Sequence, residues 1–185
     1  ERAPRSARNG RPRRFSAGAT SQEGRLSDRV LVTGVAGFVG STLADRLLSE
    51  GRTVRGVDCF TDYYPRRIKE SNLREALAHD RFELVEADLA TADLAPILEG
   101  VGSVCHLAAQ AGVRSSWGSS FGTYLDCNVA ATQRLLEWVR DRTISRFVYA
   151  SSSSVYGDTD DLPMREQGRT RPVSPYGVTK LAAEH

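Results

Sequence analysis

The chain has 185 residues, of which 40% are hydrophobic and 26% charged, and its formal net charge is +2. This length fits one domain with a sizeable core. No stretch approaches the ~20 consecutive apolar residues of a membrane-spanning helix. Beyond the first segment the charges are mixed in sign, so neither a membrane nor a nucleic acid is predicted as a partner.

Residues 1–27 differ in composition from the rest of the chain. They are rich in Arg, Ser, Gly and Ala and contain few large apolar side chains, so burial cannot offset the entropy of ordering them. We expect a disordered tail here, followed by one domain over residues 28–185. An organelle transit segment has a similar composition, but the absence of apolar periodicity favours a tag, an upstream extension or a plain tail.

After this segment, short apolar runs alternate with helical patterns. Strands are predicted at residues 30–32, 53–57, 82–85, 104–107 and 147–150, and several of them are β-branched and apolar, as in strands covered on both faces. The repeated strand-helix order predicts an α/β fold, with a parallel, doubly wound, Rossmann-like sheet and right-handed crossovers.

The helices are predicted from residues that recur on one face. The first places Val39, Leu43 and Leu47 at i, i+4 and i+8, with Gly51 suited to its end. Others are predicted at residues 65–79, 91–99 and 121–140. In the last of these, one face carries Tyr124, Asn128, Ala131, Leu135 and Trp138.

A glycine-rich turn joins the first strand to the first helix, with the order Thr33-Gly34-Val35-Ala36-Gly37-Phe38-Val39-Gly40. Gly34 permits the tight turn, Gly37 lets the backbone approach a pyrophosphate, and Gly40 lets the helix lie close to the sheet. The helix N-terminus offers unpaired N–H groups to phosphates. Three glycines alone also fit an ordinary strand-to-helix turn. Between a strand and an amphipathic helix, they predict a dinucleotide site.

Asp58 ends the second predicted strand, where a carboxylate accepts hydrogen bonds from the adenosine ribose. Its charge would repel a 2′-phosphate, so NAD is predicted over NADP. The alternative is a solvated loop aspartate. Arg55, within the strand, and Arg66 and Arg67, later in the chain, are nearby cations that count against this preference.

Tyr176 and Lys180 form a Tyr-x-x-x-Lys pair in a helical pattern, so they share a helix face. A phenol has a pKa of ~10, and a phenolic base near neutrality needs a drop of ~3 units, or ~4 kcal/mol. A unit charge at ~4 Å in an effective dielectric of ~20 supplies ~4 kcal/mol. A lysine is therefore strong enough to assist a tyrosine base, although such a pair also occurs by chance on helix surfaces.

A run of serines, residues 151–154, follows the fifth strand, at the sheet edge where ligands of such folds bind. Its hydroxyls can bond to a sugar oxygen. The alternative is a turn whose serines satisfy their own backbone.

The remaining candidates for special chemistry are cysteines and histidines. Cys59, Cys105 and Cys127 are odd in number and lack CxxC spacing, which predicts buried free thiols in a reducing compartment. No histidine lies in a metal-ligand motif, and no metal is expected. His106 ends an apolar run and is interpreted as a packed side chain.

Taken together, these motifs resemble the extended short-chain dehydrogenases/reductases, the NAD-dependent epimerase/dehydratase family that acts on nucleotide sugars. The resemblance spans about residues 29–185 and implies that Tyr176 is the base, that Lys180 holds the nicotinamide ribose and assists Tyr176, and that Ser152 completes the trio. Asn128 is expected to organise a helix and a loop. The cofactor contacts that the resemblance and the glycine turn imply come from Gly34, Gly37, Phe38, Val39, Gly40, Asp58, Asp88, Leu89, Leu107, Ala108, Ala109, Tyr176 and Lys180.

Within the family, the runs at residues 58–65 and 108–114 resemble UDP-glucuronate and UDP-glucose 4-epimerases. Dehydratases carry an acidic pair after their Ser or Thr, to protonate the departing oxygen, and decarboxylases tend to carry a Glu there. In this chain Ser153 and Ser154 occupy those places. Substrate contacts are expected from Arg114, Ser152, Ser153 and Ser154.

The resemblance thus implies inversion at C4 of a UDP-hexose or UDP-hexuronate through a transient 4-keto sugar, in a cytoplasmic homodimer. A 4,6-dehydratase or decarboxylase is the alternative enzyme, and a non-catalytic NAD-binding protein is the alternative of another class. The chain starts with Glu1 and ends at His185 within a helical pattern. We therefore expect a fragment that lacks the C-terminal substrate lobe and is inactive alone.

Overall fold

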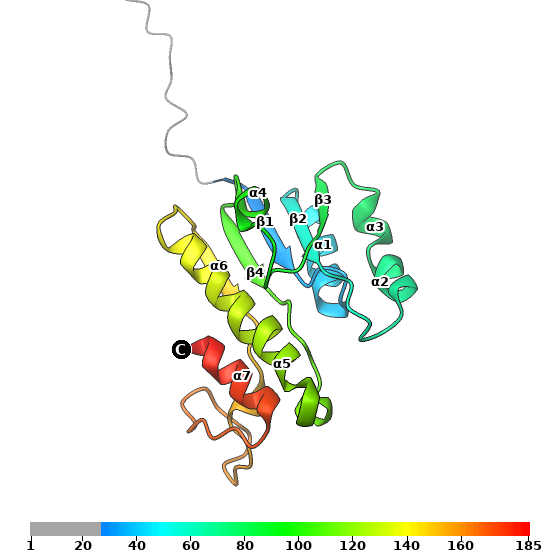
Figure 1. Ribbon diagram of the computed structural model, residues 1–185. Coiled ribbons are helices and arrows are strands. Elements are labelled where there is room, and N and C mark those ends of the chain that lie inside the picture. Colours follow the sequence, from blue (N-terminus) through cyan, green and yellow to red (C-terminus); the bar gives the residue numbers. More distant parts are fainter. Residues whose placement is uncertain (1–26) are drawn as a thin grey trace, which may run out of the picture.

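The computed structural model describes residues 27–185 (Figure 1). The predicted tail lies outside this part of the chain except for Ser27, whose hydroxyl donates to the Gly100 carbonyl. Five parallel strands form one sheet in the order β3-β2-β1-β4-β5. The predicted doubly wound α/β fold is confirmed. The strands are β1 (Arg29–Thr33), β2 (Thr53–Asp58), β3 (Phe82–Glu86), β4 (Ser103–His106) and β5 (Arg146–Tyr149).

The strand order changes direction between β1 and β4, because the chain builds outward from β1 first on one side and then on the other. Thr33 at the end of β1 pairs with His106 at the end of β4, and His106 pairs with Tyr149 at the end of β5. Ligands of such sheets bind at this switch point, beyond the carboxyl ends of the strands.

Helices cover both faces of the sheet. α1 (Phe38–Ser49), α2 (Arg66–Asn72) and α3 (Arg74–Leu77) lie toward one face, where the core contains Val30, Val32 and Leu73. α4 (Leu94–Leu98) and α6 (Ala131–Arg140) cover the other face, where Leu31 and Leu135 are buried. Successive side chains of β1 point into one core and then the other, so its central residues are all buried and apolar.

The remaining helices lie near α6 (Figure 1). α5 (Phe121–Tyr124) continues through a π-helical turn, Leu125–Ala130, into α6. α7 (Pro175–Glu184) lies beside this segment. Short 3-10 turns occur at Arg114–Ser116, Gly118–Ser120 and Ser153–Val155. Among residues 27–185, no helix is long and apolar enough to cross a membrane.

The first helix has the predicted period but buries a different line of residues. Gly40, Ala44 and Leu48 are buried, Leu43 and Leu47 pack only partly against the core, and Val39 is 61% exposed. The small residues face the sheet because they allow a close approach. The predicted end is confirmed: Gly51 has φ +85° and donates to the Leu48 carbonyl at 3.0 Å.

Three predicted helices differ from the observed ones. The helix at 65–79 breaks at Leu73 into α2 and α3. The helix at 91–99 shortens to Leu94–Leu98, because the Asp93 carboxylate accepts the Ala95 N–H and caps it there. The helix at 121–140 is continuous but includes the π-helical turn. On its predicted inner face Tyr124, Asn128, Ala131 and Leu135 are buried, whereas Trp138 is only partly buried.

Candidate functional site

A pocket of about 310 Å³ opens at the carboxyl ends of β1, β2 and β4. Every predicted cofactor-binding residue between Gly34 and Ala109 lines this pocket. The lining includes Gly34, Gly37, Phe38, Val39, Gly40, Asp58, Asp88, Leu89, Leu107, Ala108 and Ala109. Tyr63, Lys69, Gln110 and Cys127 also line it and were not predicted. Tyr176 and Lys180 lie outside this lining.

The glycine turn forms the floor of the pocket. Gly34 has φ +67°, and a Cβ there would lie 2.8 Å from the Ala108 backbone nitrogen. A Cβ on Gly40 would lie 2.2 Å from the Gly34 carbonyl oxygen, so neither position has room for a side chain. Gly37 begins α1 in an extended conformation, and no side chain caps the helix. The first N–H groups of α1 therefore stay open toward the pocket, an arrangement that fits a pyrophosphate.

A buried chain of hydrogen bonds connects β1, β4 and α6 behind this turn. The Thr33 hydroxyl oxygen accepts the N–H groups of Leu107 and Ala108 at 3.1 and 3.0 Å. Its own proton is thus left for Nδ1 of His106, 2.7 Å away. Nε2 of His106 then donates to the Thr132 hydroxyl at 2.9 Å, and Thr132 donates to the Asn128 carbonyl.

His106 is therefore a packed, neutral side chain, as the sequence predicts. It is 1% exposed, and burial, assisted by the charge of Lys180, lowers the pKa of His106 to about 4. Its role in the site is to hold the backbone of Leu107 and Ala108, through Thr33, at the wall of the pocket.

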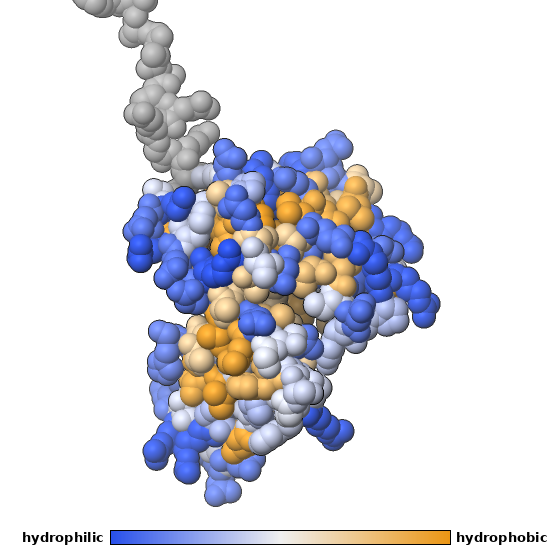
Figure 2. Space-filling view, viewed as in Figure 1, coloured by the Kyte–Doolittle hydropathy of each residue, from blue (hydrophilic) through white to orange (hydrophobic). Residues whose placement is uncertain are grey.

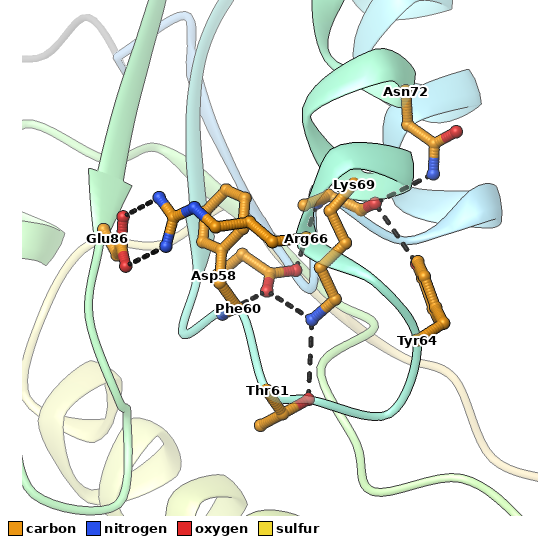
Figure 3. Close-up of polar contacts among 9 residues, drawn as sticks. Asp58, Phe60, Thr61, Tyr64, Arg66, Lys69, Asn72 and Glu86 are labelled. Atoms are coloured by element: carbon orange, nitrogen blue, oxygen red, sulfur yellow. Dashed lines mark hydrogen bonds and ion pairs between the residues drawn. The ribbon is translucent and has the colours of Figure 1, made fainter.

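Asp58 is buried at the end of β2, and both of its oxygens are engaged (Figure 3). Oδ2 accepts the Ala36 N–H of the glycine turn at 3.1 Å, and Oδ1 accepts the Phe60 N–H at 2.8 Å. The Lys69 ammonium lies 3.2 Å from Oδ1. Asp58 thus fastens the glycine turn to β2, in addition to facing the pocket.

Lys69 was missed by the sequence reasoning. It is 5% exposed, and it shares a helical line with the buried Leu73 and Ala76, at i+4 and i+7. This spacing from two apolar residues could have predicted that the lysine lies on the inner face of α2.

The arginines near Asp58 are committed elsewhere. Arg55 points to the other face of the sheet, where it pairs with Glu83 and donates to the carbonyls of Pro96, Ile97 and Glu99. Arg66 forms a bidentate salt bridge with Glu86, which Figure 3 shows. Arg67 is exposed and does not line the pocket.

The predicted catalytic residues lie on the next part of the same sheet edge, after β5. The Ser152 hydroxyl oxygen accepts the Ser154 N–H at 3.1 Å, so its own proton remains available. Ser174 caps α7 by accepting the Gly177 N–H at 3.0 Å. A Cβ on Gly177 would lie 2.6 Å from the Ser154 carbonyl oxygen, so α7 rests directly on the serine turn. Ser153 is exposed there.

Both Tyr176 and Lys180 project from α7, and Lys180 is the more deeply buried of the two. The Tyr176 side chain packs edge-on against Tyr124, with ring centroids 6.3 Å apart. Lys180 is 2% exposed, and its ammonium lies 4.3 Å from the centre of the Tyr149 ring. Burial lowers the pKa of Lys180 to about 8, against the opposing charge of Glu184. Among residues 27–185, no hydrogen bond directly joins Ser152, Tyr176 and Lys180.

Asn128 links the pocket wall to α7. Its side chain accepts the Gln110 N–H at 2.7 Å, and it donates to the Gln110 carbonyl at 3.2 Å and to the Thr179 hydroxyl at 3.0 Å. These are the contacts of an organiser, the role expected for it. Arg114, an expected substrate contact, is exposed in its 3-10 turn and does not line the pocket.

The cysteines are free but less buried than predicted. Cys59 is exposed, and Cys105 and Cys127 are half-buried. Cys59 and Cys127 line the pocket, which leaves one side of each without packing. Burial raises the pKa of all three thiols. Within residues 27–185, no group of His, Cys, Asp and Glu side chains is arranged to hold a metal ion.

Comparison with known proteins places these features in one family. The sequence profile of the GDP-mannose 4,6-dehydratase family matches residues 31–185. An uncharacterised UDP-glucose epimerase of Bacillus subtilis (strain 168) is 48% identical over 157 residues, which cover 84% of this chain and 49% of the relative. A UDP-glucuronate 4-epimerase of Thermodesulfobacterium geofontis (strain OPF15) is 39% identical over 158 residues, covering 83% and 48%.

Among solved structures, UDP-glucuronic acid 4-epimerase from Bacillus cereus, in complex with UDP-glucuronic acid and NAD, matches with a TM-score of 0.82 at 40% identity. The match covers 85% of this chain and 50% of that chain. This chain therefore spans about half the length of the relatives it matches. By its fold, its glycine turn and the profile match, the chain belongs to the GDP-mannose 4,6-dehydratase family of NAD-dependent epimerases and dehydratases.

Proposed function

We propose that this chain provides the NAD-binding and proton-transfer half of a nucleotide-sugar 4-epimerase, acting on a UDP-hexose or UDP-hexuronate. One observation carries the proposal: the glycine pocket, the serine turn with Ser152, and α7 with Tyr176 and Lys180 lie along one sheet edge. Thr33 pairs with His106 across β1 and β4, His106 pairs with Tyr149 across β4 and β5, and Lys180 rests on Tyr149.

The pocket supports NAD as the cofactor. Gly34 and Gly40 leave a cradle that side chains would fill, the uncapped start of α1 suits a pyrophosphate, and Asp58 is placed for a ribose hydroxyl. A structural relative contains NAD in its crystal structure, in agreement with the cofactor predicted from the sequence. When bound, NAD⁺ supplies the acceptor and later the donor of the C4 hydride.

The protein's own residues supply the proton chemistry and the positioning. Tyr176 takes the proton of the C4 hydroxyl and returns it after the 4-keto sugar has presented its other face. Because the pKa of Lys180 is about 8, its side chain is mostly an ammonium near neutral pH, and this charge stabilises the tyrosinate. The Ser152 hydroxyl, which only accepts a hydrogen bond within the turn, donates one to the sugar oxygen.

The residues next to Ser152 favour epimerisation over the alternatives. Elimination of water needs an acid beside the departing oxygen, and Ser153 and Ser154 stand where that acid would be. We therefore place 4,6-dehydration and decarboxylation second, and a purely NAD-binding role third. Ser153, Ser154 and Arg114 remain the proposed substrate contacts.

A homodimer is the proposed assembly of the complete enzyme, through the helices of residues 121–140 and α7. Exposed apolar side chains project from this region, among them Leu125, Leu136 and Val178. Figure 2 shows a group of apolar side chains in the lower part of the face in view, where Figure 1 places α7. An uncovered apolar patch of this kind marks an interaction surface.

Incubation of the complete protein and NAD⁺ with UDP-glucose and with UDP-glucuronate tests the proposal. We expect a product of unchanged mass, inverted at C4, and Tyr176→Phe should abolish its formation while NAD⁺ binding stays nearly intact. Loss of water would identify a dehydratase, and loss of CO₂ a decarboxylase. NAD⁺ binding with no sugar conversion would identify a binding protein.

A further inference from the structure

The NAD-specific end of the pocket contains a buried cation. Besides Asp58 and Asp88, the charged side chains that line the pocket within residues 27–185 include one cation, Lys69. Its ammonium lies 3.2 Å from Oδ1 of Asp58 and 3.4 Å from the Thr61 hydroxyl. Figure 3 shows these groups converging on the loop that follows β2.

Lys69 also contacts groups other than Asp58. It extends from α2 with 5% of its surface exposed. The centres of the Phe60 and Tyr64 rings lie 5.7 and 5.4 Å from its ammonium. Tyr64 and Asn72 both donate to the Ala36 carbonyl, which ties this loop and α2 to the glycine turn. Without the carboxylate of Asp58, the ammonium of Lys69 would keep its contacts with the Thr61 hydroxyl and the Tyr64 ring.

We propose that Lys69 is a latent phosphate-binding residue that Asp58 neutralises, so the Asp58–Lys69 pair, rather than Asp58 alone, sets the choice between NAD and NADP. The inference rests on the proposed cofactor function. With the pair intact, the carboxylate accepts ribose hydroxyls and repels a 2′-phosphate. Without the carboxylate, the ammonium of Lys69 and the hydroxyl of Thr61 face the position of the ribose and present donors to that phosphate.

The other cations of the region cannot take this role. Arg66 is paired with Glu70 and Glu86, and Arg55 is held on the opposite face of the sheet. Arg67 lies on the same helix as Lys69 but is exposed and outside the pocket lining. It therefore offers a matched control for the loss of one positive charge.

The experiment measures binding by calorimetry on the complete chain, with 5′-AMP, adenosine 2′,5′-bisphosphate, NAD⁺ and NADP⁺ as probes. In the wild type we expect 5′-AMP and NAD⁺ to bind more tightly than their 2′-phosphorylated counterparts. Asp58→Ser should shift the affinity ratio toward the 2′-phosphorylated probes by about a hundredfold, or ~2.7 kcal/mol. Lys69→Met in the same background should remove most of that shift, whereas Arg67→Met should keep it.

The outcomes separate this proposal from the cofactor assignment. A shift that persists in Asp58→Ser/Lys69→Met, or no shift in Asp58→Ser while 5′-AMP still binds, would overturn the role of Lys69 and leave NAD binding standing. A wild-type chain that binds none of the probes would overturn both. Thermal melting with each probe shows which variants are folded, and Asp58→Asn, which keeps the side-chain shape, takes the place of Asp58→Ser if the serine variant does not fold.

Discussion

Lys180 is positioned by an aromatic ring as well as by its helix. Its ammonium lies 4.3 Å from the centre of the Tyr149 ring, and a cation over such a ring gains ~0.5–2 kcal/mol, the upper value when water is excluded. The Tyr149 hydroxyl itself is buried without a hydrogen-bond partner. Tyr149 therefore contacts Lys180 through its ring and not through its hydroxyl.

This ring should affect the pH dependence of turnover. Since burial places the pKa of Lys180 at about 8, kcat/KM of the complete enzyme should decline above that pH as the ammonium is lost. Tyr149→Leu removes the ring and should move this decline to lower pH, with about a tenfold loss of kcat/KM at pH 8. Tyr149→Phe should behave as the wild type. An equal effect of both substitutions would show that the hydroxyl matters instead.

At the scale of elements, α7 depends on a close contact with the serine turn. Gly177 is buried in the first turn of α7, and a Cβ there would lie 2.6 Å from the Ser154 carbonyl oxygen and 3.0 Å from Cβ of Pro172. A backbone oxygen cannot yield as the end of a flexible side chain does. Any side chain at this position must move α7, and with it Tyr176 and Lys180, away from Ser152.

Gly177→Ala should therefore lower both stability and activity. We expect the free energy of unfolding to fall by ~1–3 kcal/mol, as for an overpacked core, and turnover to fall more than tenfold. Gly122→Ala is the matched control, because it also lies in a helix and a Cβ there meets nothing within 4 Å. Urea denaturation and the epimerase assay measure the two effects, and equal behaviour of both variants would contradict the close-contact explanation.

At the scale of the whole molecule, His106 makes stability depend on pH. Its pKa is about 4 in the folded chain and 6.5 without the fold. Between these values the unfolded chain binds a proton that the folded chain does not, so stability is lost as the pH falls. The loss from pH 6.5 to 4 amounts to ~3 kcal/mol.

Urea denaturation at several pH values between 7 and 4 checks this prediction. The free energy of unfolding should decrease with acid in the wild type and in His79→Gln. In His106→Gln the starting stability should be lower, because the hydrogen bonds to Thr33 and Thr132 are disturbed, but the slope against pH should be shallower. A slope unchanged by His106→Gln would assign the acid sensitivity to carboxylates elsewhere.

The last prediction concerns the 185-residue polypeptide alone. Its pocket covers the cofactor end of the site, whereas Ser152, Tyr176 and Lys180 lie outside the pocket lining and Ser153 is exposed. We expect NAD⁺ binding but no measurable epimerisation of UDP-glucose or UDP-glucuronate, since an open site neither positions the sugar nor excludes water. The Bacillus cereus epimerase is the positive control. Turnover within about tenfold of it, ~1.4 kcal/mol, would contradict the expectation.

The strands, the glycine turn and the place of Asp58 were predictable from local sequence patterns. These features depend on neighbours along the chain: apolar runs bounded by turns, a glycine with φ +67° at Gly34, and a helix end marked by Gly51. The line of buried residues from Tyr124 to Leu135 was predictable for the same reason, because a helical period is a local property.

The contacts between these parts could be seen only in the folded chain. The pairing of Lys69 with Asp58 and the chain from Thr33 through His106 to Thr132 join residues up to 73 positions apart. The one-residue offset of the buried face of α1 depends on how closely Gly40 approaches the glycine turn. Contacts of this kind are fixed by strand order and register, and no local pattern specifies them, because the same helical period fits a helix turned to bury either of two neighbouring lines of residues.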